Sequence, residues 1–323
     1  MKTSSPATLR RHVRALTAGG PRDFGSTAQA RAREYIVGTL RRHGWDIRRL
    51  AFSVRPAISL NDDPRPRHPF PLRFFRRLDG VDIIAVPAWG IREARDWTAL
   101  SAHYDTVPGS VGADDNTSGV AALLEAARLL KKTKSPITLV FFDREETGMQ
   151  GADAWARRAG PSVSSLTNLE MVGHFVRDPD SNPVPLLARL TFPGAAGLLR
   201  ARLYRRDSVI IVSDRRSRHL ADSLAASCAG VGLPAIEVAD PRPAGQVRHL
   251  FTPVLPATSL LERSDHSKFW NHGIPAVMAT VGTPNATPHY HRATDTAPTL
   301  DYARLAKVAD AVVAHATRLA AVR

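Results

Sequence analysis

The feature that most constrains the fold is the run Ile137–Phe142, which is apolar apart from Thr138 and ends at the charged sequence Asp143-Arg144-Glu145-Glu146. An apolar run without polar alternation is typical of a central strand that is covered on both faces. Further short strands are predicted between helical patterns, at 81–86, 99–102, 166–172 and 274–281. This alternation predicts a mostly parallel sheet with helices on both sides, and such sheets bind ligands beyond the carboxyl ends of their strands.

The chain length of 323 residues suffices for one large α/β domain or two small ones, and we expect a single domain over residues 1–323. Residues 6–54 predict two helices and a strand, and residues 300–321 predict a final helix. Residues 60–79 are rich in Pro and Arg and predict an irregular surface loop. The least regular stretch, 177–262, predicts a cap or lid over the site.

Composition limits the metal chemistry and the location of the chain. The single cysteine, Cys228, excludes an internal disulfide and cysteine-rich zinc sites, and we expect it in the core. Any metal must therefore be held by His, Asp and Glu, which suits zinc, manganese or cobalt. The sequence has neither the apolar stretch of a signal peptide nor the ~20 apolar residues of a membrane-spanning helix. We therefore expect a cytoplasmic protein with no membrane partner.

The formal net charge of +14 raises the question of nucleic-acid binding. The arginines are spread along the chain, and their local clusters at 65–77 and 200–218 lie in no recognisable nucleic-acid-binding motif. This pattern favours a solvated arginine-rich surface, with a site for acidic substrates or partners as the alternative. Nucleic acid is therefore not an expected partner, and the oligomeric state stays open.

Two polar motifs follow the apolar run at 99–102. In His103-Tyr104-Asp105, one imidazole nitrogen can bind a metal while the other donates a hydrogen bond to a carboxylate, which fixes the tautomer. A turn then leads to Ala113-Asp114-Asp115-Asn116, at the start of a helical pattern. One of the two aspartates is expected to cap free amides of the helix. The other can bridge two cations, because co-catalytic ions lie about 3.5–4 Å apart.

Four more candidates complete a possible ligand set. The side chains of Glu145 and Glu146 diverge, so one can bind metal while its neighbour faces a water molecule as general base. Glu170 lies in an apolar setting, where metal coordination or an ion pair must stabilise its charge. His291 closes the set, whereas we expect His289 to be a surface or packing residue.

Taken together, these motifs resemble the zinc exopeptidase family of the bacterial leucyl aminopeptidase type, whose distant relatives include glutamate carboxypeptidase and the glutaminyl cyclases. The resemblance extends from the segment Leu9–Phe24 to Tyr290-His291 and the final helix. It implies a three-layer α/β/α sandwich around a mixed, mostly parallel central sheet. It also implies hydrolysis of the N-terminal peptide bond of peptide substrates, by a water that bridges two zinc ions and is activated by Glu145.

The same resemblance implies a role for each residue of the set. His103, Asp115 and Glu170 would hold one zinc ion, and Asp115, Glu146 and His291 the other, with Mn²⁺ or Co²⁺ as alternatives to zinc. Asp115 occupies the family's bridging position, Glu145 that of the general acid/base, and Asp105 that of the carboxylate that orients the first histidine. Tyr290 resembles a tyrosine that hydrogen-bonds the developing oxyanion. The segment Ser264-Asp265-His266 resembles one that builds the substrate pocket.

Two residues depart from the family pattern. Glu170 stands where most members have aspartate, and the extra methylene would shift the ion or the pocket slightly. Arg292 follows the last histidine where a small or polar residue is usual, so that a positive charge would border the site and attract an acidic substrate or a free carboxylate. Three alternatives therefore stay open: a carboxypeptidase or dipeptidase, a one-zinc glutaminyl cyclase, and a non-catalytic binding protein.

Overall fold

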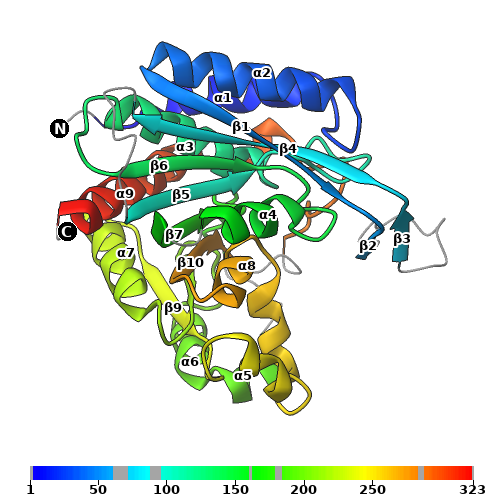
Figure 1. Ribbon diagram of the computed structural model, residues 1–323. Coiled ribbons are helices and arrows are strands. Elements are labelled where there is room, and N and C mark those ends of the chain that lie inside the picture. The colour runs from blue at the N-terminus through cyan, green and yellow to red at the C-terminus, as the bar shows by residue number, and fades with distance from the viewer. Residues whose placement is uncertain are drawn as a thin grey trace.

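The computed structural model describes residues 3–60, 72–87, 96–159, 162–178, 184–282 and 287–321. Within these ranges, eight strands form one mixed sheet in the order β1-β4-β6-β5-β7-β10-β8-β9 (Figure 1). The strands are β1 Trp45–Val54, β4 Leu78–Pro87, β5 Trp97–His103, β6 Ile137–Phe142, β7 Val163–Leu169, β8 Val209–Ser213, β9 Ala235–Ala239 and β10 Ala276–Val281. The central strands β6, β5, β7 and β10 run parallel, whereas the pairs β1–β4, β4–β6 and β10–β8 are antiparallel.

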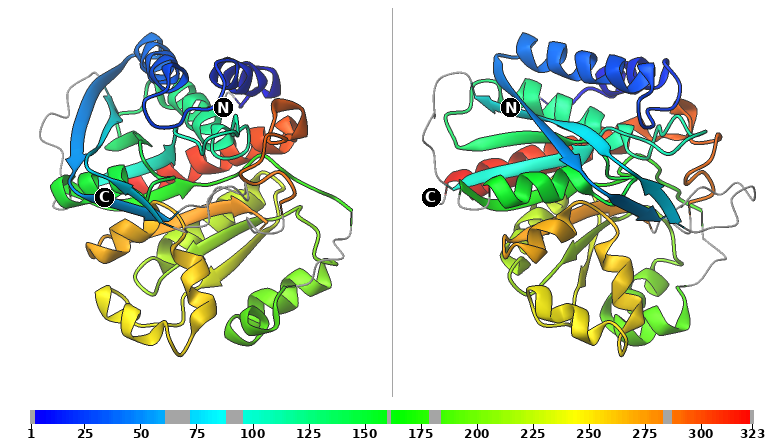
Figure 2. Two further views of the ribbon diagram at one scale, coloured as in Figure 1. Left: turned by 90° about the vertical axis from the view of Figure 1, so that its right-hand side faces the viewer. Right: turned by 45° about the vertical axis from the view of Figure 1, so that its right-hand side comes forward.

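Helices cover both faces of this sheet (Figure 2), which confirms the three-layer α/β/α sandwich. One face is covered by α1 Pro6–Thr17, α2 Thr27–Arg42, α3 Thr117–Leu130, α7 Arg218–Gly230 and α9 Tyr302–Ala321. The other face is covered by α4 Gln150–Ala159, α6 Pro193–Ala201 and α8 His266–Asn271. Within the described ranges, every helix is too short or too polar to span a bilayer.

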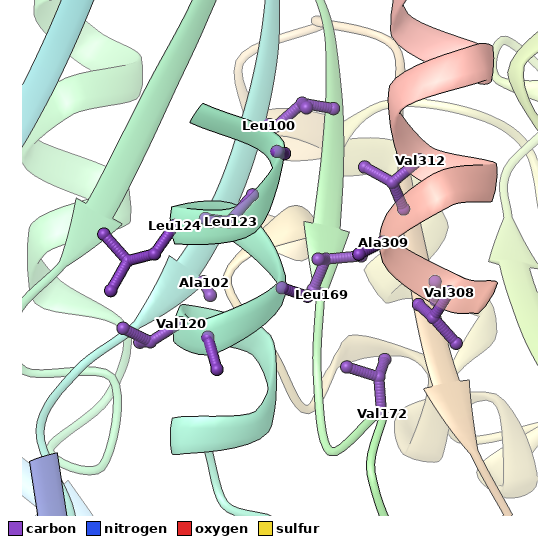
Figure 3. Close-up of a cluster of buried hydrophobic side chains, with 14 of the residues drawn as sticks. Leu100, Ala102, Val120, Leu123, Leu124, Leu169, Val172, Val308, Ala309 and Val312 are labelled. Atoms are coloured by element: carbon purple, nitrogen blue, oxygen red, sulfur yellow. The ribbon is translucent and has the colours of Figure 1, made fainter. Parts of the chain in front are cut away.

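The apolar run that predicted a central strand does form β6, and its residues alternate between the two layers. Leu139 and Phe141 belong to the core beneath α1, α2 and α3, whereas Val140 and Phe142 belong to the core beneath α4 and α8. In the first of these cores, Figure 3 shows Val120 and Leu123 of α3 near Leu100 and Ala102 of β5, with Val308 and Val312 of α9 beside β7. Cys228 is buried in the same core, as expected.

Local interactions define both ends of α2. The Ser26 hydroxyl accepts a hydrogen bond from the amide of Gln29 at 3.1 Å, which satisfies one of the free amides of the first turn. After the helix, Gly44 has a φ of 79°, a conformation that glycine adopts without a Cβ clash. The polypeptide can therefore turn directly into β1.

The prediction of an irregular loop over 60–79 was wrong at its ends. Strands β2 Ala57–Leu60 and β3 Leu72–Phe75 form a separate two-stranded antiparallel sheet, and β4 begins at Leu78. β2 and β3 pair with each other, and β4 pairs with β1. Hydrophobic periodicity does not reveal backbone pairing of this kind. Phe74, for example, is 72% exposed. Residues 61–71 lie outside the described residues.

The stretch 177–262 is more regular than predicted, because it contributes β8, α7 and β9 to the sheet and its cover. Outside the sheet lie α5 Leu186–Thr191, α6 and the 3₁₀ helices η2 Gln246–Phe251 and η3 Pro256–Glu262. A short 3₁₀ helix, η5 Ala297–Thr299, precedes α9. That the outer elements form a cap or lid stays a prediction, as does the single domain.

Candidate metal centre

The candidate ligands lie at one edge of the sheet because three parallel strands end there. His103 is the last residue of β5, and Glu145 and Glu146 follow the end of β6 within four residues. Glu170 immediately follows β7, which ends at Leu169. The strand predicted for 166–172 therefore lies three residues earlier in the chain than expected, at 163–169. Glu170 lies just beyond it, at the edge where ligands of α/β sheets are found.

Asp115 is at the centre of the cluster. Its Oδ1 atom lies 3.2 Å from Nε2 of His103, and its Oδ2 atom lies 3.2 Å from Nε2 of His291. Nε2 of His103 is also 3.4 Å from Oε1 of Glu170, and Nε2 of His291 is 3.2 Å from Oε2 of Glu146. The five residues expected to bind metal thus converge, with each imidazole facing a different oxygen of one carboxylate.

The two expected ligand groups are not separated into independent pockets. A ring nitrogen of His103 and carboxylate oxygens of Asp115 and Glu146 all lie within 4.8 Å of one another, although Glu146 was assigned to the other ion. This overlap is compatible with two ions close together that share a carboxylate. A single ion bound by these three residues is the alternative arrangement.

The charges of the cluster suit a cation. Burial, and then the nearby carboxylate of Asp115, raise the pKa of Glu146 to about 7, and burial also raises the pKa of Glu170. Burial alone would lower the pKa of His291, but the carboxylates of Glu146 and Asp115 outweigh it and raise this pKa to about 12. Oε1 of Glu146 is buried and has no hydrogen-bond partner within the described structure. A buried site with more hydrogen-bond acceptors than donors is suited to a bound divalent ion.

Asp105 lies behind the first histidine, as predicted. Its Oδ1 atom is 3.4 Å from Nδ1 of His103, on the side of the ring opposite to the ligand cluster. The same carboxylate accepts hydrogen bonds from the amides of Glu145 and Glu146, each at 3.2 Å. One buried side chain therefore orients an imidazole and the backbone of the acidic pair together. The carboxylate Oε2 of Glu145 lies 4.0 Å from Nε2 of His103, at the margin of the cluster.

The expectation that one of the paired aspartates caps the helix was wrong. The N-cap of α3 is Asn116, whose side chain accepts a hydrogen bond from the amide of Gly119 at 3.2 Å. Asp114 instead accepts a hydrogen bond from the amide of Gly173 at 2.8 Å. Asparagine accepts as well as aspartate at an N-cap, which leaves Asp115 available to the two histidines.

Further side chains hold the ligands in place, and one of them, Asp295, was missed by sequence reasoning. The carboxylate of Asp295 accepts hydrogen bonds from the amides of Asp114 at 2.8 Å and Asp115 at 3.1 Å. The hydroxyl of Ser264 donates to Oε2 of Glu170 at 2.7 Å, so the segment 264–266 contacts a candidate ligand. The proximity of Asp295 to the final histidine in the sequence is the one local signal that could have identified it.

A buried arginine connects the two halves of the cluster. Nε of Arg22 donates to the carbonyl of Tyr104 at 2.7 Å, and its Nη2 donates to the hydroxyl of Thr117 at 2.7 Å. Arg22 thereby joins the motif that contains His103 to the first residue of α3. Arg22 is only 1% exposed. The sequence favoured a solvated arginine-rich surface, but this guanidinium group is buried and stabilises the site through its hydrogen bonds.

The remaining candidates lie around this core. The ring of Tyr290 stacks on that of His291 with 3.7 Å between centroids, and its hydroxyl accepts a hydrogen bond from Arg263 at 3.4 Å. His289 is half-buried and contacts Thr294 and the ring of His174, in keeping with a packing role. Arg292 is exposed. Its effect on substrates stays a prediction.

Comparisons with known proteins agree with this architecture. The chain is 29% identical over 229 residues to uncharacterized protein YfbL of Escherichia coli, an alignment that covers 66% of this chain and spans 64% of that relative. Its fold matches BSAP, a zinc aminopeptidase from Bacillus subtilis, with a TM-score of 0.69, 16% identity and coverage of 97% and 94% of the two chains. It also matches Porphyromonas gingivalis glutaminyl cyclase, with a TM-score of 0.65, 20% identity and coverage of 98% and 99%.

The family assignment rests on a match of more than half of the chain. The profile of peptidase family M28 matches residues 87–195 and 237–316. These ranges contain all five candidate metal ligands together with Asp105, Glu145 and Tyr290. The chain belongs to peptidase family M28 and shares the fold of zinc aminopeptidases.

Proposed function

We propose that the chain is a zinc aminopeptidase that binds two ions and hydrolyses the N-terminal peptide bond of peptides. The observation that carries this proposal is the position of Asp115, whose two oxygens face the imidazoles of His103 and His291, each at 3.2 Å. In the proposed assignment, Glu170 joins His103 at one ion and Glu146 joins His291 at the other. Zinc bound there would polarise the substrate carbonyl and lower the pKa of a bound water.

Glu145 is the proposed general base and acid. Its side chain is 11% exposed, so it can meet a substrate from solvent while its backbone is held by Asp105. Burial and the nearby Glu146 raise the pKa of Glu145 in the absence of cations, whereas positive charge at the neighbouring ligands would favour its ionised form. The ionised carboxylate would accept a proton from water and then donate it to the leaving amine.

Tyr290 and Asp105 are proposed to assist this chemistry in different ways. Burial raises the pKa of Tyr290, which keeps its hydroxyl protonated and able to donate a hydrogen bond to a developing oxyanion. Stacking on His291 fixes its ring beside a proposed ligand. Asp105 would hold His103 in the tautomer that leaves Nε2 free to bind metal.

The experiment that tests the proposal compares matched peptides with free and blocked termini. Zinc-loaded enzyme should cleave a peptide with a free amino terminus and leave its N-acetylated counterpart intact, and blocking the carboxyl terminus should have little effect. The variant Glu145→Gln should lose most turnover, about 100-fold or more, because it lacks the proton acceptor. Cleavage that requires a free carboxylate would instead identify a carboxypeptidase.

Glutaminyl cyclase is the second candidate, because the fold matches that of the P. gingivalis enzyme over nearly the full length of both chains. Two proposed features favour the peptidase: a full set of five ligands and a carboxylate shared between two imidazoles. Cyclisation of an N-terminal glutamine by enzyme that binds a single zinc ion would reverse this preference.

A further inference from the structure

Exposed apolar side chains are concentrated at one end of the molecule. Of the thirteen large hydrophobic residues that are exposed in the described structure, ten lie in 186–203 and 247–260, and we call these ten the apolar face. Leu190, Leu250 and Val254 are the most exposed, at 69%, 75% and 78%. Eight of the ten belong to α5, α6, η2 and η3, and Leu203 and Val254 lie in the turns that follow α6 and η2. These elements lie at the end opposite α1 and α2 (Figures 1 and 2). Such a concentration marks an interaction surface.

The two segments that carry the apolar face contain no acidic residue, and the first acidic residue after the second segment, Glu262, is paired with Arg248. Neither 184–206 nor 241–261 contains an Asp or a Glu. Arg189 of α5 and Arg200 of α6 are exposed, and neither forms an ion pair within the described residues. By contrast, Arg242 and Arg248 are buried, and they pair with Asp240 and Glu262. The accessible charge of this face is therefore positive, and it is interspersed with leucines.

We infer that the apolar face binds the surface of an anionic lipid bilayer. Exposed leucines on short helices can enter the boundary between headgroups and acyl chains, while guanidinium groups pair with lipid phosphates. A spanning helix is not needed for binding of this kind. The face is held firmly enough to present these side chains, because Ala188 of α5 and Ala196 of α6 are buried beneath it.

A second copy of the chain fits this surface less well. Two copies that met face to face would bring Arg189 and Arg200 of each near those of the other, without a carboxylate in either segment to neutralise them. The net charge of +14 on each chain adds to this repulsion. An anionic partner removes both problems, and a bilayer also accepts apolar side chains that lie over a broad area.

The test is sedimentation with vesicles of phosphatidylcholine, with and without phosphatidylglycerol. The variant Leu190→Glu/Leu250→Glu places two charges in the apolar face. The matched control, Ile58→Glu/Phe74→Glu, adds the same two charges at residues that are 55% and 72% exposed but lie in β2 and β3. Circular dichroism and thermal unfolding establish that both variants fold. The readout does not use peptidase activity, so its failure is distinct from failure of the proposed function.

We expect the wild-type chain to bind only the vesicles that contain phosphatidylglycerol, and to bind them more weakly as salt increases. The control should retain binding within about threefold, whereas the variant in the apolar face should lose about tenfold or more. Equal loss in both variants would mean that net charge alone drives binding and would overturn the proposal. An absence of vesicle binding by the wild-type chain would also overturn it. In that case a concentration-dependent dimer that Leu190→Glu/Leu250→Glu abolishes would assign the face to a second copy.

Discussion

Replacement of Asp105 by asparagine separates its proposed role behind His103 from a merely structural one. Both oxygens of this carboxylate are occupied, one by the amide of Glu145 and the other by the amide of Glu146, each at 3.2 Å. Asparagine has a single acceptor oxygen, so its NH₂ group must face one of these amides. A buried donor that loses its acceptor costs about 1–3 kcal/mol, which corresponds to about 5–150-fold in an equilibrium constant.

Part of this cost should appear in metal binding, because Asp105 also faces Nδ1 of His103 at 3.4 Å. Loss of a carboxylate behind a ligating histidine typically reduces metal affinity or activity by about 10–100-fold. We therefore expect Asp105→Asn to weaken zinc binding by about that factor in a competition titration against a chelator. The value of kcat/KM for a free-amine peptide should fall by a similar factor.

A matched control is available in Asp143, which is also buried and accepts hydrogen bonds from the amides of Val81 and Arg144. Asp143→Asn should reduce the free energy of unfolding while changing zinc affinity by no more than about threefold, since none of its hydrogen bonds reaches a proposed ligand. If Asp105→Asn binds zinc within about twofold of the wild-type chain, the role assigned to Asp105 is refuted.

Three further outcomes follow from the same geometry. Asp115→Asn should abolish tight zinc binding, whereas Asp114→Asn should keep it. Burial raises the pKa of Asp114, and its side chain accepts a hydrogen bond from the amide of Gly173 instead of facing the histidines. Equal zinc contents in the two variants would contradict this prediction. Removal of zinc with a chelator should lower the thermal midpoint, which calorimetry would measure, because the buried carboxylates then repel one another; an unchanged midpoint would argue against a bound ion. Burial lowers the pKa of His315 from 6.5 to about 3. As the pH falls below 6.5, the unfolded chain therefore takes up the proton first and stability is lost, by about 2 kcal/mol at pH 5. Denaturant titrations should show a smaller loss between about pH 7 and pH 5 in His315→Gln, and an equal loss would contradict the assignment.

The sheet and the ligands at its strand ends could be predicted from the sequence because their signals are local. The largely apolar run of β6 indicated a strand buried on both faces, and the acidic pair that follows it had to lie at a strand end. His103 was located in the same way, as the residue after an apolar run. Parallel neighbours place such residues at one edge, so their convergence needed no knowledge of distant contacts.

The contacts that Asp295 and Ser264 make to the ligands could not be predicted, because they join distant parts of the chain. Asp295 is separated from Asp115 by 180 residues, and Ser264 is separated from Glu170 by 94. No local pattern records such pairs. The cap of α3 was misassigned for a different reason, since Asp and Asn cap helices about equally well and only the fold decides which one does. Pairing of β2 with β3 likewise depends on backbone contacts rather than on the period of the side chains.

The central claim is that Asp115 is shared by two ions, and the number of zinc ions bound per chain tests it most directly. Chelator-treated wild-type chain should be titrated with zinc, and the metal content after removal of excess should be measured by mass spectrometry. We expect two equivalents in the wild-type chain, and we expect Asp115→Asn to retain neither tightly. Saturation at one equivalent in fully folded wild-type chain would contradict the shared carboxylate and favour a one-zinc enzyme on this fold.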